Sequence, residues 1–176
     1  MNVGKKLAFA AIAVTAVALS TTVQADRVKW KMHSAWGSSL PHLGTNAWRF
    51  AENIGRMSGG DFSVKAYEPG ALIPANEGFD ATSKGSIEMA WTTAGYDTGK
   101  YPALAFFTAV PFGPSIGEYM AWKMFGGGTE LEREIYASHN IHENDCLAIG
   151  PETSGWFKNE ITDLEQLKGK KLRFFG

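Results

Sequence analysis

The chain has 176 residues, 44% of them hydrophobic, and its 17 basic and 18 acidic side chains give a formal net charge of −1 at pH 7. Nucleic-acid binding requires a basic face, so this balance argues against that function. Cys146 is the only cysteine, which excludes an intrachain disulfide and leaves stability to a hydrophobic core that a chain of this length can build.

The N-terminus has the features of an export signal. Lys5 and Lys6 precede an apolar stretch over 7–19, and the small residues that end at Ala25 suit cleavage after that position. The apolar stretch is too short for a stable transmembrane helix. We therefore expect residues 1–25 to be a signal peptide and the mature protein to be periplasmic. Its charge falls to −3, because cleavage removes the two lysines and no acid.

The hydrophobic pattern then predicts an α/β fold. Apolar residues alternate over 28–33 and 62–66, as in strands, and recur at helical spacing over 41–57 between them. A strand, a helix and a strand in this order predict a βαβ unit and hence a parallel sheet. In chain order, the other predicted elements are a helix over 74–83, a strand over 87–91, a buried connection over 102–114, helices over 115–125 and 129–138, strands over 147–150 and 156–157, a short helix from 162, and a strand over 172–175.

Three helix starts carry capping signals. Ser115 is predicted to cap the helix that follows it, and the pairs Thr129 with Glu132 and Thr162 with Glu165 match the spacing of a capping box. These positions predict where the backbone turns into a helix.

Small polar residues follow two of the predicted strands. The loop 34–39 surrounds Trp36, and the run 92–96 leaves the carboxyl end of the strand over 87–91. Open α/β sheets bind ligands at that edge. We therefore expect a ligand site there.

Signatures of catalysis are weak in this sequence. The glycines at 126–128 lack the lysine and the spacing of a P-loop, and we interpret them as a break between two helices. His139 and His142 are metal-ligand types, but they lie where a polar loop is expected in any case. Cys146 begins an apolar run, which favours a buried hydrophobic role over a nucleophilic one.

Arg173 stands among apolar residues in the last predicted strand. An unpaired guanidinium is costly to desolvate, and its planar fork binds a carboxylate through two parallel hydrogen bonds. Two interpretations follow: Arg173 binds an anionic ligand, or it lies along a strand edge with its head group in water. The preceding polar loop over 151–157 is either a carboxylate cradle or an ordinary crossover. A strand at the end of the chain has nothing to pair against, so we expect the front part of a longer protein.

Six stretches carry the pattern of a known family, namely 68–72, 85–89, 109–112, 122–128, 155–157 and 167–173. Together they resemble the periplasmic solute-binding proteins of TRAP transporters, the DctP family, and the last stretch is the most specific. The similarity extends over 28–176 and is greatest to the branch that includes 2-oxoacid binders. It implies a periplasmic-binding-protein-like fold of two α/β lobes, with 26–150 forming most of lobe one and 151–176 forming the interlobe crossover and the start of lobe two.

The resemblance also implies roles for single residues. Arg173 would pair with the carboxylate of the transported acid, Tyr96 would face the cleft from lobe one, and Trp156 would come from the crossover. Ser34 and Trp36 are further candidates for substrate binding.

In the 2-oxoacid branch a sodium ion assists binding, and a glutamine ligand of that ion corresponds to Glu152 here, so a sodium site would differ in charge. The implied partners are a small organic acid and the TRAP membrane permease, and the implied role is capture without catalysis. Two alternatives stay open: a periplasmic sensor component, or a carboxylate-processing enzyme on a similar fold that uses Glu152, His139 and His142.

Overall fold

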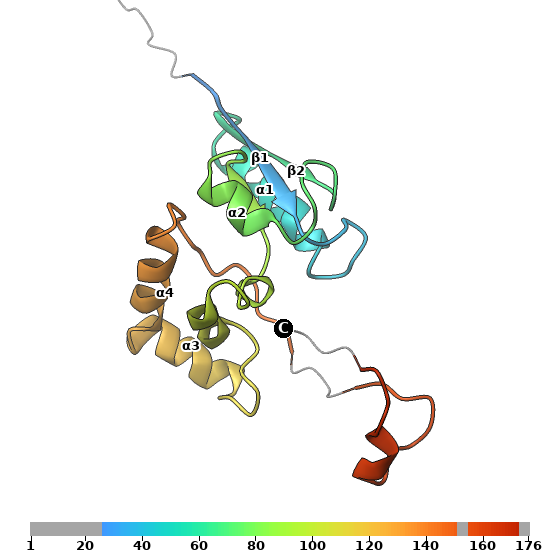
Figure 1. Ribbon diagram of the computed structural model, residues 1–176. Coiled ribbons are helices and arrows are strands. Elements are labelled where there is room, and N and C mark those ends of the chain that lie inside the picture. Colours follow the sequence, from blue (N-terminus) through green and yellow to red (C-terminus); the bar gives the residue numbers. More distant parts are fainter. Residues whose placement is uncertain (1–25, 151–154, 173–176) are drawn as a thin grey trace, which may run out of the picture.

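The structure is a computed structural model that describes residues 26–150 and 155–172 (Figure 1). Within these residues, strands β1 (Val28–Ser34), β2 (Phe62–Tyr67) and β3 (Met89–Trp91) form a parallel sheet with the order β2-β1-β3. Helix α1 (Thr45–Met57) connects β1 to β2. The predicted βαβ unit and parallel sheet are therefore confirmed. The predicted signal peptide lies outside the described residues, and none of the described helices is long and apolar enough to cross a membrane.

The register of the sheet decides which loops become neighbours. β1 pairs with β2 along most of its length, but only its last three residues pair with β3, from Met32 opposite Met89 to Ser34 opposite Trp91. The amide of Ala35 then donates to the carbonyl oxygen of Trp91 at 3.0 Å. The carboxyl ends of β1 and β3 consequently lie side by side.

Helix α1 packs on the sheet through its small residues. Ala47 and Ala51, one turn apart, are buried with Met32 and Trp91 in the first core cluster. The indole nitrogen of Trp91 donates to the carbonyl oxygen of Leu43 at 2.8 Å, which ties the segment before α1 to β3. That segment consists of turns, so α1 begins later than the predicted start at 41.

The second core cluster lies where the chain leaves the sheet. It joins helix α2 (Gly78–Ser83), the 3₁₀ turns η1 (Ala94–Tyr96) and η2 (Pro102–Phe107), and helix α4 (Gly128–Ala137). Phe79, Ala94 and Leu104 are its buried residues. Helix α3 (Ile116–Phe125) packs beside α4, and Figure 1 shows this pair apart from the sheet, beyond the η turns.

One of the three predicted helix caps is confirmed. Ser115 caps α3 and forms a full capping box with Glu118. The predicted box of Thr129 with Glu132 is wrong, because both residues already lie inside α4. The Thr129 hydroxyl instead donates to the carbonyl oxygen of Lys123 at 2.8 Å, and Glu132 is buried against the Lys123 side chain. Tertiary contacts between α3 and α4 therefore use both side chains.

A similar correction applies to the last described helix. The 3₁₀ turn η3 (Leu164–Leu167) is capped by Asp163, whose carboxylate accepts from the Glu165 amide at 2.8 Å. Thr162 was expected in that place; its amide donates to the Gln166 side chain instead.

Three further predictions differ from the structure, namely the strands over 147–150 and 156–157 and the burial of the connection over 102–114. Residues 147–150 and 156–157 form no strand within the described ranges, and no described segment offers either of them a backbone to pair with. The predicted strand over 172–175 lies mostly outside the described residues. The connection over 102–114 was expected to be buried, but only part of it is: Leu104 is inaccessible, whereas Phe112 is fully exposed.

Candidate functional site

Three of the predicted site residues meet at the carboxyl edge of the sheet. The indole nitrogen of Trp36 donates to the hydroxyl oxygen of Tyr96 at 3.2 Å, and the two ring centroids lie 6.0 Å apart. The Ser34 hydroxyl donates to the Trp36 carbonyl oxygen at 2.7 Å and accepts from the Trp36 amide at 3.2 Å. The loops after β1 and β3 are thereby joined through side chains.

Local structure places each of these residues. Ser34 is the buried last residue of β1, and its hydrogen bonds to Trp36 turn the chain back immediately after the strand. Tyr96 ends η1, which is capped by Thr93, whose hydroxyl accepts from the Gly95 amide at 3.4 Å. Trp36 and Tyr96 are both partly buried. An indole and a phenol in this setting can contact a small ligand through apolar faces and polar tips.

Glu68 is a further residue at this edge that the sequence analysis did not single out. It follows β2, and its carboxylate accepts from the Ser38 amide at 3.0 Å. Glu68 thus ties the loop that carries Trp36 to the turn after β2. The only signal in the sequence was its position before Pro69 and Gly70, in a stretch that resembles the family.

A small pocket is lined in part by Gly95, the residue before Tyr96. It has a volume of about 240 Å³ and mainly apolar walls. Its lining includes Gly95 and Thr98 from the segment after β3 and Phe106 and Val110 from η2 and the residues after it. The hydroxyl oxygens of Thr93 and Thr108 lie 3.4 Å apart, a contact between the same two parts of the chain.

Asp97, the residue after Tyr96, is the titratable group closest to this cluster in sequence. It is buried, and burial raises the pKa of its carboxyl group to about 6, although the nearby charge of Lys100 acts in the opposite direction. The loop that carries Tyr96 therefore contains an acid that titrates near neutral pH.

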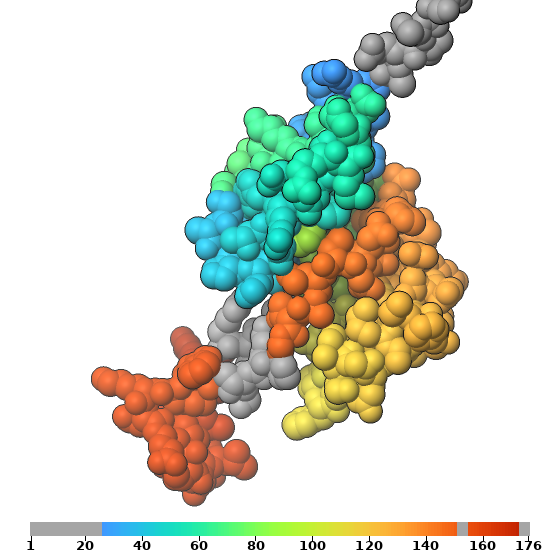
Figure 2. Space-filling model, turned by 180° about the vertical axis from the view of Figure 1, so that it is seen from behind, coloured from blue at the N-terminus to red at the C-terminus, as the bar shows by residue number. Residues whose placement is uncertain are grey.

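The other predicted site residues are not part of this cluster. Trp156 is 92% exposed and lies in the segment 155–172, which Figures 1 and 2 show apart from the rest of the described chain. Arg173 and Glu152 lie outside the described residues. The roles of these three residues stay predictions.

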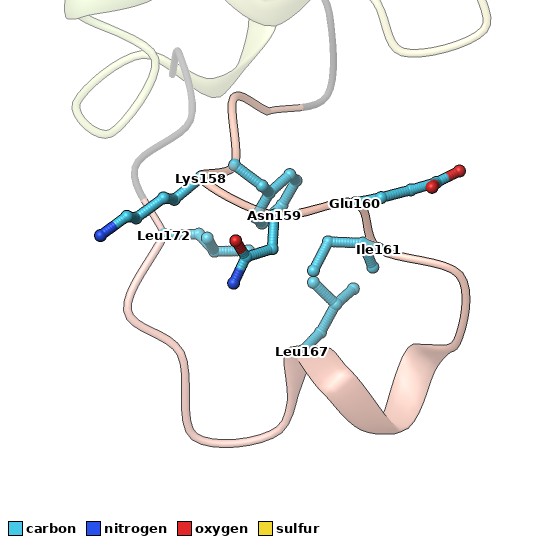
Figure 3. A pocket seen from close by; sticks show the side chains of 7 residues that line it. Lys158, Asn159, Glu160, Ile161, Leu167 and Leu172 are labelled. Carbon is cyan, nitrogen blue, oxygen red and sulfur yellow. The ribbon is translucent and has the colours of Figure 1, made fainter.

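The segment 155–172 encloses a pocket of its own, with a volume of about 520 Å³ (Figure 3). Ile161 and Leu167 face each other across it, whereas the charged ends of Lys158 and Glu160 point away. Phe157, Asn159 and Leu172 complete the lining. Because the segment has few residues, we interpret this pocket as a gap in an apolar cluster rather than as a ligand site.

The residues considered as metal ligands do not converge in the described chain. His139 is partly buried and packs against Tyr101 and Phe79 of the second core, with ring centroids 4.3 and 5.4 Å away. Three carboxylates do gather nearby, from Glu132, Glu143 and Asp145. They surround the buried ammonium group of Lys123, which contacts Glu132 and lies 2.9 Å from Asp145.

Cys146 is exposed, so its expected burial is wrong. Its thiol is nevertheless a poor nucleophile, because partial burial of the sulfur, together with the carboxylates of Asp145 and Glu143, raises its pKa. The thiol donates to the carbonyl oxygen of Asn144 at 3.4 Å.

Comparison with known proteins gives a consistent result. The chain is 36% identical over 176 residues to a monocarboxylate 2-oxoacid-binding periplasmic protein of Nostoc sp., which covers 95% of this chain and 48% of that one. A TRAP periplasmic solute-binding protein of Colwellia psychrerythraea, solved with bound calcium and pyruvate, matches with a TM-score of 0.80 and 33% identity over 85% of this chain and 46% of that one. A relative from Bordetella bronchiseptica, solved with calcium and picolinate, matches with a TM-score of 0.78 and 31% identity, over 85% of this chain and 44% of that one.

The chain thus spans about half the length of these relatives. Their structures have two lobes and the match covers one, which confirms the predicted fold class. The predicted periplasmic location agrees with the extracytoplasmic nature of the relatives. Residues 33–175 also match a family model described as bacterial extracellular solute-binding protein, family 7. This chain, whose sheet carries Ser34, Trp36 and Tyr96 at one edge, therefore belongs to the DctP family of solute-binding proteins.

Proposed function

We propose that the whole protein is the extracytoplasmic solute-binding subunit of a TRAP transporter, which captures an organic acid and delivers it to a membrane permease. Family membership over residues 33–175 is the observation that carries this proposal. Relatives more than 30% identical to this chain include a protein named for 2-oxoacid binding and a structure solved with pyruvate. A small carboxylate, with a 2-oxoacid as the leading candidate, is therefore the proposed ligand class.

The contacts at the sheet edge support a binding surface on lobe one. Trp36 and Tyr96 are held together by a hydrogen bond, so their rings are positioned before any ligand arrives. In this proposal Arg173 neutralises the carboxylate from the start of lobe two, and Trp156 adds an apolar wall from the crossover over 151–176. Ser34 contributes by fixing the backbone of Trp36 rather than by contacting the ligand.

Capture then follows from electrostatics. An open cleft admits the acid, and closure of the two lobes excludes water around the ion pair with Arg173. The pair becomes stronger as the local dielectric falls. The closed form would present a surface that the permease recognises. In this proposal the ligand leaves the protein chemically unchanged.

A cation accompanies the ligand in this proposal. The relatives from Colwellia psychrerythraea and Bordetella bronchiseptica hold calcium, and one from Pseudoalteromonas atlantica holds sodium with pyruvate. Glu152, where the 2-oxoacid branch has a glutamine, would add one negative charge to such a site. Carboxylate oxygens are preferred ligands of calcium, so the charge of Glu152 favours a divalent ion over sodium.

The first test is native mass spectrometry of the full-length protein purified from the periplasm. An organic-acid adduct that is released on denaturation supports the proposal and identifies the ligand by its mass.

The second test compares the variant Arg173→Ala with Arg49→Ala, which removes an exposed positive charge on α1. Loss of the Arg173 contact should weaken binding by about 2–5 kcal/mol, whereas the Arg49 control should bind normally. Unchanged affinity in Arg173→Ala would refute the role of this residue.

A further inference from the structure

The side chain of His33 is fully buried near the carboxyl end of β1. Successive side chains of a strand point to opposite faces of the sheet. Met32, the residue before it, packs with α1 in the first core cluster, so His33 faces the other side of the sheet. A Cβ atom added at Gly78, the first residue of α2, would lie 3.5 Å from the Cδ2 atom of His33. The imidazole ring is thus enclosed between the sheet and the start of α2.

One ring nitrogen of His33 has a hydrogen-bond partner in the part of the chain that the structure describes, and the other has none. Nε2 lies 3.1 Å from the carbonyl oxygen of Ala75, whereas Nδ1 is buried without a partner. A carbonyl oxygen can only accept, so Nε2 carries the hydrogen and donates it. Nδ1 is then an unpaired acceptor, which is unfavourable for folding. Leucine would fill a similar space without this penalty, so the distinctive contribution of His33 is its hydrogen bond to Ala75.

This hydrogen bond anchors the segment 68–77, which connects β2 to α2. The other end of the segment is held by Glu68, whose carboxylate accepts from the Ser38 amide at 3.0 Å. Ser38 belongs to the loop after β1. The segment is therefore attached at Ala75 to His33 in the strand itself, and at Glu68 to the loop that the strand leads into. These contacts form a closed circuit at the carboxyl edge of the sheet.

We propose that His33 is a positioning residue of the ligand site, which acts through the segment 68–77 on the loop that carries Trp36. The inference rests on the proposed function, since that function assigns Trp36 and Tyr96 to ligand binding. Ser34 holds the same loop through its two hydrogen bonds to the backbone of Trp36. His33 and Ser34 are adjacent in β1 and project to opposite faces of the sheet. The last two residues of the strand therefore fix the loop by two separate routes.

Three substitutions of His33 in the full-length protein separate the hydrogen bond from packing. His33→Gln keeps an N–H donor about as far from the backbone as Nε2, whereas His33→Asn places its donor near the position of Nδ1. His33→Leu fills the site and donates nothing. We expect His33→Leu and His33→Asn to weaken the binding of pyruvate about three- to tenfold in isothermal titration, because each loses the donor to Ala75. His33→Gln should bind pyruvate almost as well as the wild type.

The indole N–H group of Trp36 provides a second readout that needs no ligand. It donates to the Tyr96 hydroxyl, so its NMR signal, assigned with the variant Trp36→Phe, reports the geometry of that pair. We expect the signal to shift in His33→Leu and His33→Asn and to stay near its wild-type position in His33→Gln. Lys123→Met is the control for a loss of stability alone, because its ion pair joins α3 to α4. It should bind pyruvate normally and leave the Trp36 signal in place.

Normal pyruvate affinity and an unshifted Trp36 signal in His33→Leu would overturn the proposal. Equal losses of affinity in His33→Gln and His33→Leu would also overturn it, because they would assign the effect to packing of the ring. If the wild-type protein does not bind pyruvate, the ligand class in the proposed function is wrong, and the Trp36 signal alone decides the role of His33. A shift in His33→Leu and His33→Asn, but not in His33→Gln, would then still support that role.

Discussion

Lys123 on α3 and Glu132 on α4 form an ion pair that is almost closed to solvent, with side chains that are 1% and 4% exposed. The same ammonium nitrogen lies 2.9 Å from the Asp145 carboxylate and 5.4 Å from the ring centroid of Phe107. One buried charge thus connects η2, both helices and the segment that leads away from α4. This arrangement explains how a pair of short helices keeps a fixed position next to the second core.

Removal of the buried ammonium should be costly. In Lys123→Met the Glu132 carboxylate stays buried without its counter-charge, so we expect the free energy of unfolding of the full-length protein to fall by about 3–5 kcal/mol. The double variant Lys123→Met with Glu132→Gln should recover part of that loss. Denaturant unfolding monitored by circular dichroism measures both.

The exposed ion pair between Lys100 and Asp80 provides the control. Its atoms are 2.6 Å apart, but the side chains are 50% and 34% exposed. Lys100→Met should therefore change stability by less than about 1 kcal/mol. If Lys100→Met and Lys123→Met were equally destabilising, burial would not be the reason for the importance of Lys123.

Asp97 should make the protein less stable as the pH rises. Burial raises the pKa of its carboxyl group from 3.8 to about 6, so between these values the folded state holds a proton that the unfolded state has released. The penalty grows from pH 4 and is complete above pH 6. Asp97→Asn removes it and should increase stability at pH 7 by about 2–3 kcal/mol, with no gain below pH 4. Unfolding measured from pH 4 to pH 8 tests this.

Asp80 should show the opposite sign. The hydrogen bond from Lys100 lowers the pKa of Asp80, so its ionised form stabilises the folded state at neutral pH and the benefit is lost as the pH falls through that lowered pKa. Asp80→Asn should therefore reduce stability slightly at pH 7. For comparison, the Asp97→Asn variant has its own contradicting outcome. If the gain in stability of that variant did not vary with pH, the effect of the substitution would be steric rather than electrostatic.

Two glycines near α1 should respond oppositely to the same substitution. A Cβ atom at Gly44 would lie 1.8 Å from the carbonyl oxygen of Gly37, in the loop that carries Trp36. Gly44→Ala should therefore destabilise the protein by about 3 kcal/mol or more and weaken ligand binding. Gly55 lies within α1 with nothing near its added Cβ, so Gly55→Ala should stabilise by about 0.5–1 kcal/mol. Melting temperatures of the two variants test this prediction, which is contradicted if both variants shift in the same direction.

The hydrogen bond between Trp36 and Tyr96 should contribute to ligand affinity. Trp36→Phe keeps an aromatic ring but removes the donor to the Tyr96 hydroxyl, so the Tyr96 ring is held less firmly. We expect weaker binding by about 0.5–1.5 kcal/mol in isothermal titration with the acid identified by mass spectrometry. Trp30→Phe, within β1 and packed against Phe62 away from the carboxyl edge, should bind normally. Normal affinity in Trp36→Phe would argue against a ligand site at this edge.

Local patterns predicted the elements that depend on local interactions. The alternation over 28–33 and the helical spacing over 41–57 became β1 and α1, since each pattern depends on residues that are neighbours in the chain. The buried side of β1 was predicted only in part: Met32 is buried, but Val28 is exposed and His33 is buried as well. The predicted strand over 147–150 failed because strand formation needs a partner backbone, and the described chain does not supply one.

Side-chain partners were harder to predict than elements. Thr129 and Glu132 have the spacing of a capping box, yet both make contacts to Lys123 on the preceding helix. A motif of four residues cannot report a charge that another helix brings to it. In the same way, the apolar neighbours of Cys146 suggested burial, but without a paired strand the residue is exposed.

The α/β class, the parallel βαβ unit and the family could be predicted from the sequence, because hydrophobic periodicity and short motifs are encoded by neighbouring residues. The meeting of Ser34, Trp36 and Tyr96 became visible only in the folded chain, as did the burial of Lys123 with Glu132. The parallel register aligns the end of β1 with the end of β3, so it joins loops that are 60 residues apart in sequence.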